Sequence, residues 1–190
     1  MPRIHVMGAS GSGTSTLGHH LARQLGIAHI DSDEIFWLPT DPPYRTPRPL
    51  AERRERLAER LPVEGDWVFS GSALNWAEPV EPFYDLIVFL WLDPAIRMAR
   101  IRRREAERFG PRIQPGGDMF EASQAFLAWA EAYDRAGLEH RSRASHEAWL
   151  SRRQTPVLRL DSARPLRELL LDVLERLRRD FGRHFPIGKM

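Results

Sequence analysis

The sequence predicts an α/β protein: a five-stranded parallel sheet with helices on both faces and a small lid. Three observations lead to this fold class. Strand-like and helix-like segments alternate along the chain, residues 86–92 have the continuous apolar pattern of a strand buried on both faces, and a glycine-rich turn joins the first strand to the first helix. The length of 190 residues and the hydrophobic fraction of 42% suit a single domain over residues 1–190.

The amino-terminal third begins as a βαβ unit. Residues 3–7 are apolar and alternate like a strand, residues 14–25 repeat apolar side chains at helical spacing, and residues 27–30 form a second short strand. A stiff, proline-rich connector over residues 39–49 leads to a charged helix over residues 50–61. We expect the substrate-binding segment in this region, at about residues 31–62.

The rest of the chain continues the alternation. We expect strands over residues 67–70, where Gly71 ends the pattern, and over residues 86–92 and 157–160. The remaining helices are expected over residues 94–109, 119–136, 138–150 and 165–179. Many glycines and prolines, flanked by arginines, interrupt regular structure after residue 109, so we expect a lid at about residues 104–118.

Composition excludes several classes of function. The absence of cysteine excludes disulfides, thiolate metal sites and a cysteine nucleophile. All but one of the 28 basic residues Lys+Arg are arginines, and most alternate with glutamates, as on a solvated helix face. The start of the chain lacks the pattern of a signal peptide, and no apolar stretch is long enough to cross a membrane, so we expect a cytoplasmic protein.

The segment from Gly8 to Thr16 predicts a phosphate-binding loop. It matches G-x-x-x-x-G-K-[ST] at every specified position except Thr14, which stands where the motif has lysine, and it lies between a strand and a helix as the motif requires. Its backbone N–H groups would cradle a polyphosphate at a helix N-terminus, with the Ser15 hydroxyl as a ligand of Mg²⁺. The predicted nucleotide contacts in the loop are Gly8, Ser10, Gly11, Ser12, Gly13, Thr14, Ser15 and Thr16.

Two other interpretations of this loop are weaker. A glycine-rich turn can cap a helix and bind nothing, and the glycine spacing only partly resembles a dinucleotide fingerprint, which also requires an acidic residue after the second strand. The Ser/Thr run favours a polyphosphate with a metal ion. Thr14 is a real departure, because a dispensable lysine in a chain so rich in arginine would be expected to become arginine. We therefore expect a mobile arginine to replace the missing charge.

Together with this loop, two further places make the sequence resemble the small P-loop kinases of the adenylate kinase and shikimate kinase group. Asp31-Ser32-Asp33 is similar to the acidic motif with which such kinases hold Mg²⁺ and the accepting hydroxyl, and Asp93-Pro94 followed by Arg100 and Arg104 is similar to their lid helix. The chain also resembles a group of uncharacterised bacterial adenylate kinase-like proteins with Gly-Ser-Gly-Thr loops. The resemblance implies a three-layer P-loop NTPase fold.

The resemblance also implies the cofactors ATP and Mg²⁺ and a set of roles. Ser15 and Asp31 would hold Mg²⁺, and Asp33 would orient or deprotonate an acceptor hydroxyl. The other predicted contacts are Arg104 and Arg108 for catalysis, Arg100 and Arg164 for the nucleotide, and Trp37, Arg48 and Ser72, beside Asp33, for the acceptor. Helix capping is an alternative role for the two aspartates and is compatible with the first.

The function predicted from these residues is transfer of the γ-phosphoryl group of ATP to a small-molecule or nucleotide acceptor near Asp33, by a monomer or homodimer. A second hypothesis is a nucleotide-binding switch or pseudo-kinase without efficient chemistry, because the lysine is absent. A third is nucleic-acid binding, since Arg97, Arg103 and Arg112 join the lid-helix arginines without a local surplus of acidic residues. His5, on an apolar strand, is expected to be a core residue.

Overall fold

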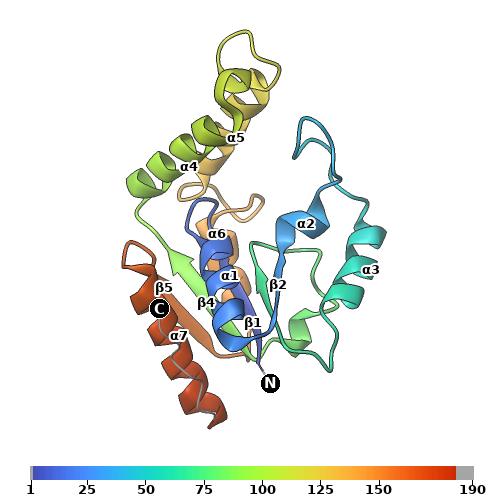
Figure 1. Ribbon diagram of the computed structural model, residues 1–190, viewed down its shortest axis with the longest axis vertical. Coiled ribbons are helices and arrows are strands. Elements are labelled where there is room, and N and C mark those ends of the chain that lie inside the picture. Colours follow the sequence, from blue (N-terminus) through green and yellow to red (C-terminus); the bar gives the residue numbers. More distant parts are fainter. Residues whose placement is uncertain (1, 183–190) are drawn as a thin grey trace.

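The computed structural model, which describes residues 2–182, contains one parallel five-stranded sheet of order β2-β3-β1-β4-β5 (Figure 1). The strands are β1 (Arg3–Gly8), β2 (Ala28–Asp31), β3 (Trp67–Ser70), β4 (Leu86–Trp91) and β5 (Val157–Asp161). The chain leaves β1 toward β2 on one side and returns to β4 on the other, which makes the carboxyl end of β1 a topological switch point, where ligands bind in open α/β sheets. The predicted fold class is confirmed; the ends of the predicted domain, residue 1 and residues 183–190, lie outside the described residues.

The helices follow the predicted order with three differences, one of which is that the helix expected over residues 119–136 ends at Ala132. The helices are α1 (Thr14–Leu25), α2 (Ser32–Phe36), α3 (Leu50–Arg60), α4 (Pro94–Phe109), α5 (Phe120–Ala132), α6 (Arg143–Leu150) and α7 (Leu166–Phe181), with 3₁₀ turns η1 (Glu81–Phe83) and η2 (Gly110–Ile113). The short helix α2 was not among the expected elements. The helix expected from residue 138 begins only at Arg143, because Ser142 caps it by accepting a hydrogen bond from the Ser145 N–H.

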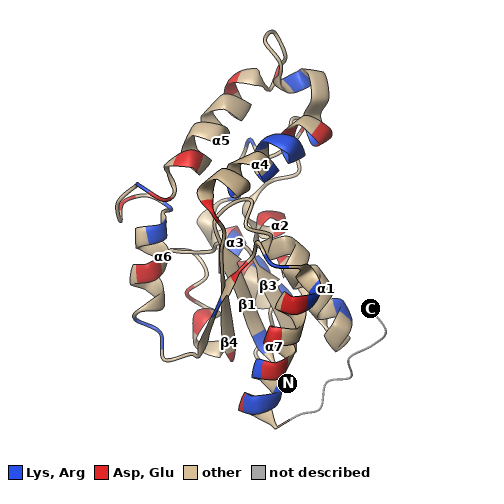
Figure 2. Cartoon of the chain, turned by 90° about the vertical axis from the view of Figure 1, so that its left-hand side faces the viewer, with Lys and Arg blue, Asp and Glu red and all other residues tan. Residues whose placement is uncertain are grey.

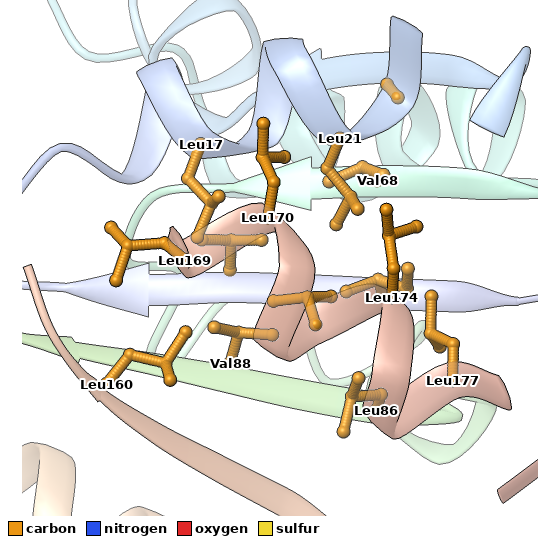
Figure 3. Packing of buried hydrophobic residues seen from close by; sticks show 14 of the residues in the cluster. Leu17, Leu21, Val68, Leu86, Val88, Leu160, Leu169, Leu170, Leu174 and Leu177 are labelled. Atoms are coloured by element: carbon orange, nitrogen blue, oxygen red, sulfur yellow. The ribbon is translucent and has the colours of Figure 1, made fainter. Parts of the chain in front are cut away.

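Helices α1 and α7 cover one face of the sheet, where α7 turns an almost entirely leucine face to the strands (Figure 3). Leu170, Val173, Leu174 and Leu177 of this helix pack with Leu21 of α1 in a fully buried cluster. The spacing of these apolar residues at three and four positions is that of an amphipathic helix. This face contributes aliphatic packing and holds the first helix beneath the glycine-rich loop.

Aromatic side chains dominate the opposite face, which α3 and α6 cover (Figure 2). His5 lies in this layer between the rings of Phe69 and Tyr84, at centroid distances of 5.2 and 4.8 Å. Its Nδ1 lies 3.2 Å from the carbonyl oxygen of Phe69. Burial lowers the pKa of His5 to about 4, so the ring is neutral in the folded protein at neutral pH. The expectation that His5 belongs to the core is confirmed.

Helices α4 and α5 project beyond the carboxyl ends of the strands as an arm (Figures 1 and 2). They pack on each other through a small cluster of their own, in which Met98 and Ile101 of α4 meet Ala130 of α5. The predicted lid residues are divided between the last turns of α4 and the turn around η2 at the tip of this arm. The arm and the segment after α2 therefore stand on opposite sides of the sheet's carboxyl edge.

Candidate functional site

A cavity of about 1670 Å³ lies beyond the carboxyl ends of the strands, between the arm and the segment that follows β2. Typical ligand pockets have volumes of about 300–1,000 Å³, so this one has room for two ligands. Most predicted site residues line it together, although they come from separate parts of the chain. These are Ser10, Ser15, Asp31, Asp33, Trp37, Arg48, Ser72, Arg104 and Arg108.

The glycine-rich loop has the backbone geometry of an anion cradle. Gly11 and Gly13 adopt φ angles of +81° and +91°, in the left-handed region that side chains disfavour. A Cβ atom at Gly8 would lie 2.6 Å from the carbonyl oxygen of Leu90, so the first glycine allows β4 to approach. The Ser12 hydroxyl donates to the Ala9 carbonyl at 2.8 Å and stabilises the loop from within. Glycine is therefore required at all three positions.

Helix α1 presents free donors where this loop ends. Gly13 is its N-cap and offers no side-chain oxygen to the first turn. The first N–H groups of any helix lack an intrahelical acceptor, so an anion at this end accepts from Thr14, Ser15 and Thr16. Ser15 also lines the cavity, whereas Thr14 and Thr16 are not among the cavity-lining residues.

Neighbouring strands hold Asp31 in place at the cavity floor. Asp31 pairs in register with Ser70 of β3, and the Ser70 hydroxyl donates to the Asp31 carboxylate at 3.2 Å. Since this hydroxyl uses its proton on Asp31, it accepts from His29 Nε2, which lies 2.9 Å away. The other Asp31 oxygen caps α2 by accepting from the Asp33 N–H at 3.0 Å. This carboxylate therefore caps α2 and lines the cavity at the same time.

Asp33 lies two residues beyond, at a solvent-exposed position in a different electrostatic environment. Desolvation within the concave site raises the pKa of this carboxyl above its ordinary value, and the neighbouring Asp31 carboxylate raises it further. The positive charges of Arg141 and Arg104 oppose this shift. A raised pKa is the property that a general base for a hydroxyl group requires near neutral pH.

The donor set fits a Mg²⁺ ion that arrives with a nucleotide. Mg²⁺ prefers oxygen ligands and is commonly held by one or two carboxylates together with phosphate oxygens. Asp31 and Ser15 offer such oxygens to the cavity. Within residues 2–182 no three His, Asp or Glu side chains gather closely enough to hold a metal by themselves. The phosphates would thus complete the coordination.

The predicted arginines differ in what they contact. Arg104 lines the cavity with its guanidinium 5.9 Å from the centre of the Phe126 ring, and Arg108 donates to the Tyr44 hydroxyl at 3.1 Å. Arg48 also reaches the cavity, but its guanidinium donates to the carbonyl oxygens of Ile35 and Trp37 and so stabilises the end of α2.

Arg100 and Arg164 lie apart from the cavity lining. Arg100 donates to the Ser162 carbonyl after β5, and Arg164 forms ion pairs with Glu168 and Asp172 of α7. The structure therefore does not bring these two predicted nucleotide contacts together with the others.

The other arginines around the arm have acidic partners, which corrects the expectation that they lack local acids. Arg97 pairs with Asp134 at 2.9 Å and Arg103 with Glu107 at 2.7 Å. Arg112 pairs with both Asp41 and Asp118. Some of these acids lie in distant segments of the chain and others lie one helical turn away. The number of acidic residues near each arginine in the sequence therefore did not predict the pairing. This pairing reduces the uncompensated charge on which the nucleic-acid hypothesis rested.

Sequence reasoning missed two features, which both come from residues 133–146. One is Arg141, whose guanidinium donates to the Gly8 carbonyl at 3.3 Å. The other is a hydrogen-bonded series in which the Tyr133 hydroxyl lies 2.7 Å from His146 Nδ1 and the Ser72 hydroxyl lies 3.0 Å from His146 Nε2. Ser142 and Ser145, three residues apart, have the spacing of a capping box. This spacing was the one local indication that the helix begins late and leaves Arg141 in a loop.

The second feature orients Ser72 toward the cavity. Burial lowers the pKa of His146 to about 3 and raises the pKa of Tyr133, so both groups are neutral at neutral pH. In the tautomer that carries its proton on Nε2, Nδ1 accepts from the Tyr133 hydroxyl and Nε2–H donates to Ser72. The Ser72 proton is left to donate to a ligand in the cavity.

Comparison with known proteins places the chain in a family. It is 40% identical over 174 residues, which cover 92% of this chain and 96% of the other, to the protein described as "Uncharacterized protein YqaC" of Bacillus subtilis (strain 168). The chain belongs to the YqaC family. A second, local similarity links this YqaC family member to the shikimate kinase of Paracidovorax citrulli (strain AAC00-1), with 59% identity over 33 residues, or 17% of this chain and 18% of that one. No family model matches the chain.

Solved structures show that the YqaC family member has the fold of the P-loop kinases. A gluconokinase from Sinorhizobium meliloti 1021 superposes with a TM-score of 0.55 at 19% identity, covering 94% of this chain and 92% of the other. A shikimate kinase from Bacteroides thetaiotaomicron superposes with a TM-score of 0.55 at 20% identity, covering 93% and 98%. These likenesses establish the three-layer P-loop fold. Within the described part of the chain, no helix combines the length and hydropathy needed to span a bilayer.

Proposed function

We propose that this protein is an ATP-dependent kinase, which transfers the γ-phosphoryl group of Mg-ATP to a small acceptor held near Asp33. One observation carries the proposal: the glycine-rich loop and the two aspartates line the same cavity, which has room for a nucleotide and an acceptor side by side. The kinase fold of the solved structures supports it.

The chain's own residues divide the work of such a transfer. Backbone N–H groups of the loop and of the first turn of α1 bind the phosphates. Ser15 and Asp31 would hold Mg²⁺, which would neutralise part of the negative charge of the phosphates. Asp33 accepts the proton of the acceptor hydroxyl while the oxygen of that hydroxyl forms a bond to the γ-phosphorus. The bond from the γ-phosphorus to the β–γ bridging oxygen breaks, which releases ADP. Ser72 donates a hydrogen bond to the acceptor.

The proposed reaction also requires that water be excluded, because water in an open site would hydrolyse ATP. Arg108 and the tip of the arm lie against the segment that carries Tyr44, which supports a site that the arm closes. We place Arg104 and Arg108 at the mouth of this site, where their charges would also compensate the transferred phosphoryl group.

The experiment that tests this function is a screen for phosphoryl acceptors. The purified protein is incubated with Mg-ATP and separate pools of sugars and polyols, hydroxy acids and nucleosides or nucleotides, and ADP formation is measured in each. We expect one pool to raise ADP formation well above the rate without acceptor, and Asp33→Asn to abolish this increase. ATP binding without transfer to any pool would contradict the kinase proposal.

That outcome would favour the second candidate, a nucleotide-binding protein without efficient chemistry. Thr14 is the observation behind it, because a neutral side chain stands where the phosphate-loop motif has a cation. The two candidates agree on ATP binding and differ in turnover alone.

A further inference from the structure

Arg141 is the cation that lies closest to the phosphate-binding loop without being committed to an acid. It comes from the loop between α5 and α6, and its Nη2 donates to the carbonyl oxygen of Gly8, the first residue of the glycine-rich loop, at 3.3 Å. Arg141 lines the same cavity as Ser10, Ser15 and Asp33. The tertiary fold therefore brings a guanidinium to the loop from a position more than a hundred residues away in the sequence.

The surroundings hold this guanidinium in place and leave donors unused. Its central carbon lies 5.3 Å from the centre of the Trp129 ring, so an aromatic face supports it. Its Nε is buried and has no hydrogen-bond partner among the described residues. Burial lowers its pKa, while the nearby Asp33 carboxylate raises it, and an arginine remains charged at neutral pH under such conditions. A charged group with a buried, unpaired donor indicates that an anion belongs beside it.

Two other arginines near the loop also have a buried Nε without a hydrogen-bond partner among the described residues, but each lies beside a carboxylate. Arg97 reaches the carbonyl oxygen of Ser10 at 3.4 Å, but it is fully buried and forms an ion pair with Asp134 at 2.9 Å. Arg104 lies 3.5 Å from a carboxylate oxygen of Glu105. Arg141, in contrast, has no carboxylate within ion-pair distance in the described part of the chain.

We propose that Arg141 supplies the positive charge that the lysine of the phosphate-loop motif supplies elsewhere, and that it acts on the β and γ phosphates of ATP. The inference rests on the proposed function, since it requires ATP at this loop. It explains why Thr14 can be neutral: the cation has moved from the first turn of α1 to the loop before α6. Guanidinium groups suit this task because their fork of N–H donors matches phosphate oxygens.

The test compares four proteins: wild type, Thr14→Lys, Arg141→Ala and the double variant. Affinities for ATP, ADP and AMP are measured by displacement of a fluorescent ATP analogue. We expect Arg141→Ala to weaken ATP binding by about 10- to 100-fold, the range expected for a lost charged hydrogen bond, and AMP binding by less than about threefold. Thr14→Lys should restore ATP binding in the Arg141→Ala background and should leave the wild-type affinity unchanged or lower it.

Arg143→Ala is the matched control. Arg143 is an exposed arginine two residues away that does not line the cavity, so its removal changes the net charge equally without touching the site. Thermal unfolding of each variant checks folding, and Arg141→Met, which keeps an apolar stem against Trp129, replaces Arg141→Ala if the latter unfolds early.

Three results would overturn the inference while leaving the proposed function intact. Arg141→Ala could bind ATP as tightly as wild type does, it could lose AMP and ATP affinity equally, or Thr14→Lys could have the same effect in both backgrounds. A wild-type protein that binds no ATP would instead contradict the proposed function itself, and with it this inference.

Discussion

The two aspartates at the cavity floor differ in their surroundings, and this difference assigns them different tasks. Asp31 is held by the Ser70 hydroxyl and by the backbone of α2, so its position is rigid and suited to a metal ion. Asp33 is solvent-exposed, but the surrounding concave site and the like charge of Asp31 raise its pKa, which suits proton transfer. Local environment, rather than residue type, separates the two roles.

We predict that Asp33→Asn lowers kcat by about 10²–10⁴-fold, the usual contribution of a general base, and changes ATP affinity by less than about twofold. In the wild type, kcat/KM should fall as the pH falls through the raised pKa of Asp33, because the protonated carboxyl cannot accept the acceptor's proton. The variant should lose this acid limb. Steady-state rates between pH 4 and 9 measure both effects, with Glu59→Gln on the exposed face of α3 as control. A variant that retains the acid limb would exclude Asp33 as the base.

The buried histidines predict a loss of stability in acid. The pKa of His5 is lowered to about 4 and that of His146 to about 3 in the folded protein. Below a pH of about 6.5, the unfolded chain binds protons that the folded chain does not, so the free energy of unfolding falls by about 1.4 kcal/mol per pH unit for each histidine. For His5 this dependence extends down to pH 4.

Urea unfolding of wild type and His5→Phe at pH 7, 6 and 5 tests this linkage. The phenylalanine variant should show a smaller change in unfolding free energy between pH 7 and 5, whatever its stability at pH 7. His140→Ala, at an exposed position, is the control. An equal slope in wild type and His5→Phe would exclude His5 as the source of the acid sensitivity.

At the scale of elements, the sequence predicted regular structure better than it predicted contacts between distant segments. Periodicity placed all five strands and most helices, because the apolar faces of elements such as α7 repeat at a fixed spacing. It failed at residues 138–142, where Leu138 extends the helical apolar pattern but lies in a loop. That loop carries Arg141, so the error in one boundary also concealed a candidate site residue. The motif at Gly8, in contrast, was visible because its chemistry is local.

Two elements meet across the mouth of the cavity. Arg112 near the tip of the arm pairs with Asp41 at 2.9 Å, Arg108 donates to the Tyr44 hydroxyl, and Arg45 donates to the Asp118 carbonyl at 3.1 Å. Such exposed contacts are screened by solvent and are weak enough to allow opening and closing. The arm is therefore suited to act as a lid.

We predict that the double variant Asp41→Asn/Tyr44→Phe has a higher ratio of ATP hydrolysis to phosphoryl transfer than the wild type has, because its lid closes less completely. Thermal unfolding should change little, since the lost contacts are exposed. Phosphate and ADP release, measured with and without acceptor, give the ratio of hydrolysis to transfer. An unchanged ratio would show that these contacts do not govern closure.

For the whole molecule, the aliphatic core under α1 and α7 is separate from the cavity lining, whereas Trp76 of the aromatic layer belongs to both a core cluster and the lining. The leucine face of α7 packs on the sheet (Figure 3), whereas the arm and the cavity lie beyond the strands' carboxyl ends (Figure 1). This aliphatic core thus holds β1 and α1, and through them the loop, without contributing to the cavity lining.

This separation predicts that Leu174→Ala costs stability without altering ligand binding. Leu174 is 1% exposed, and truncation of a buried leucine costs about 2–5 kcal/mol. Urea unfolding should register this loss, while the ATP affinity of the folded variant stays within about twofold of wild type. A large loss of affinity at a temperature where the variant is folded would contradict the separation.

The central claim is that a phosphate-binding loop without its lysine still binds Mg-ATP, and calorimetric titration tests it most directly. The wild-type protein is titrated with ATP, ADP and AMP, each with and without Mg²⁺. The account predicts that ATP and ADP bind more tightly than AMP and that Mg²⁺ strengthens ATP binding, because the loop holds the β and γ phosphates. Absence of ATP binding at millimolar concentrations, or equal affinities for AMP and ATP, would contradict it.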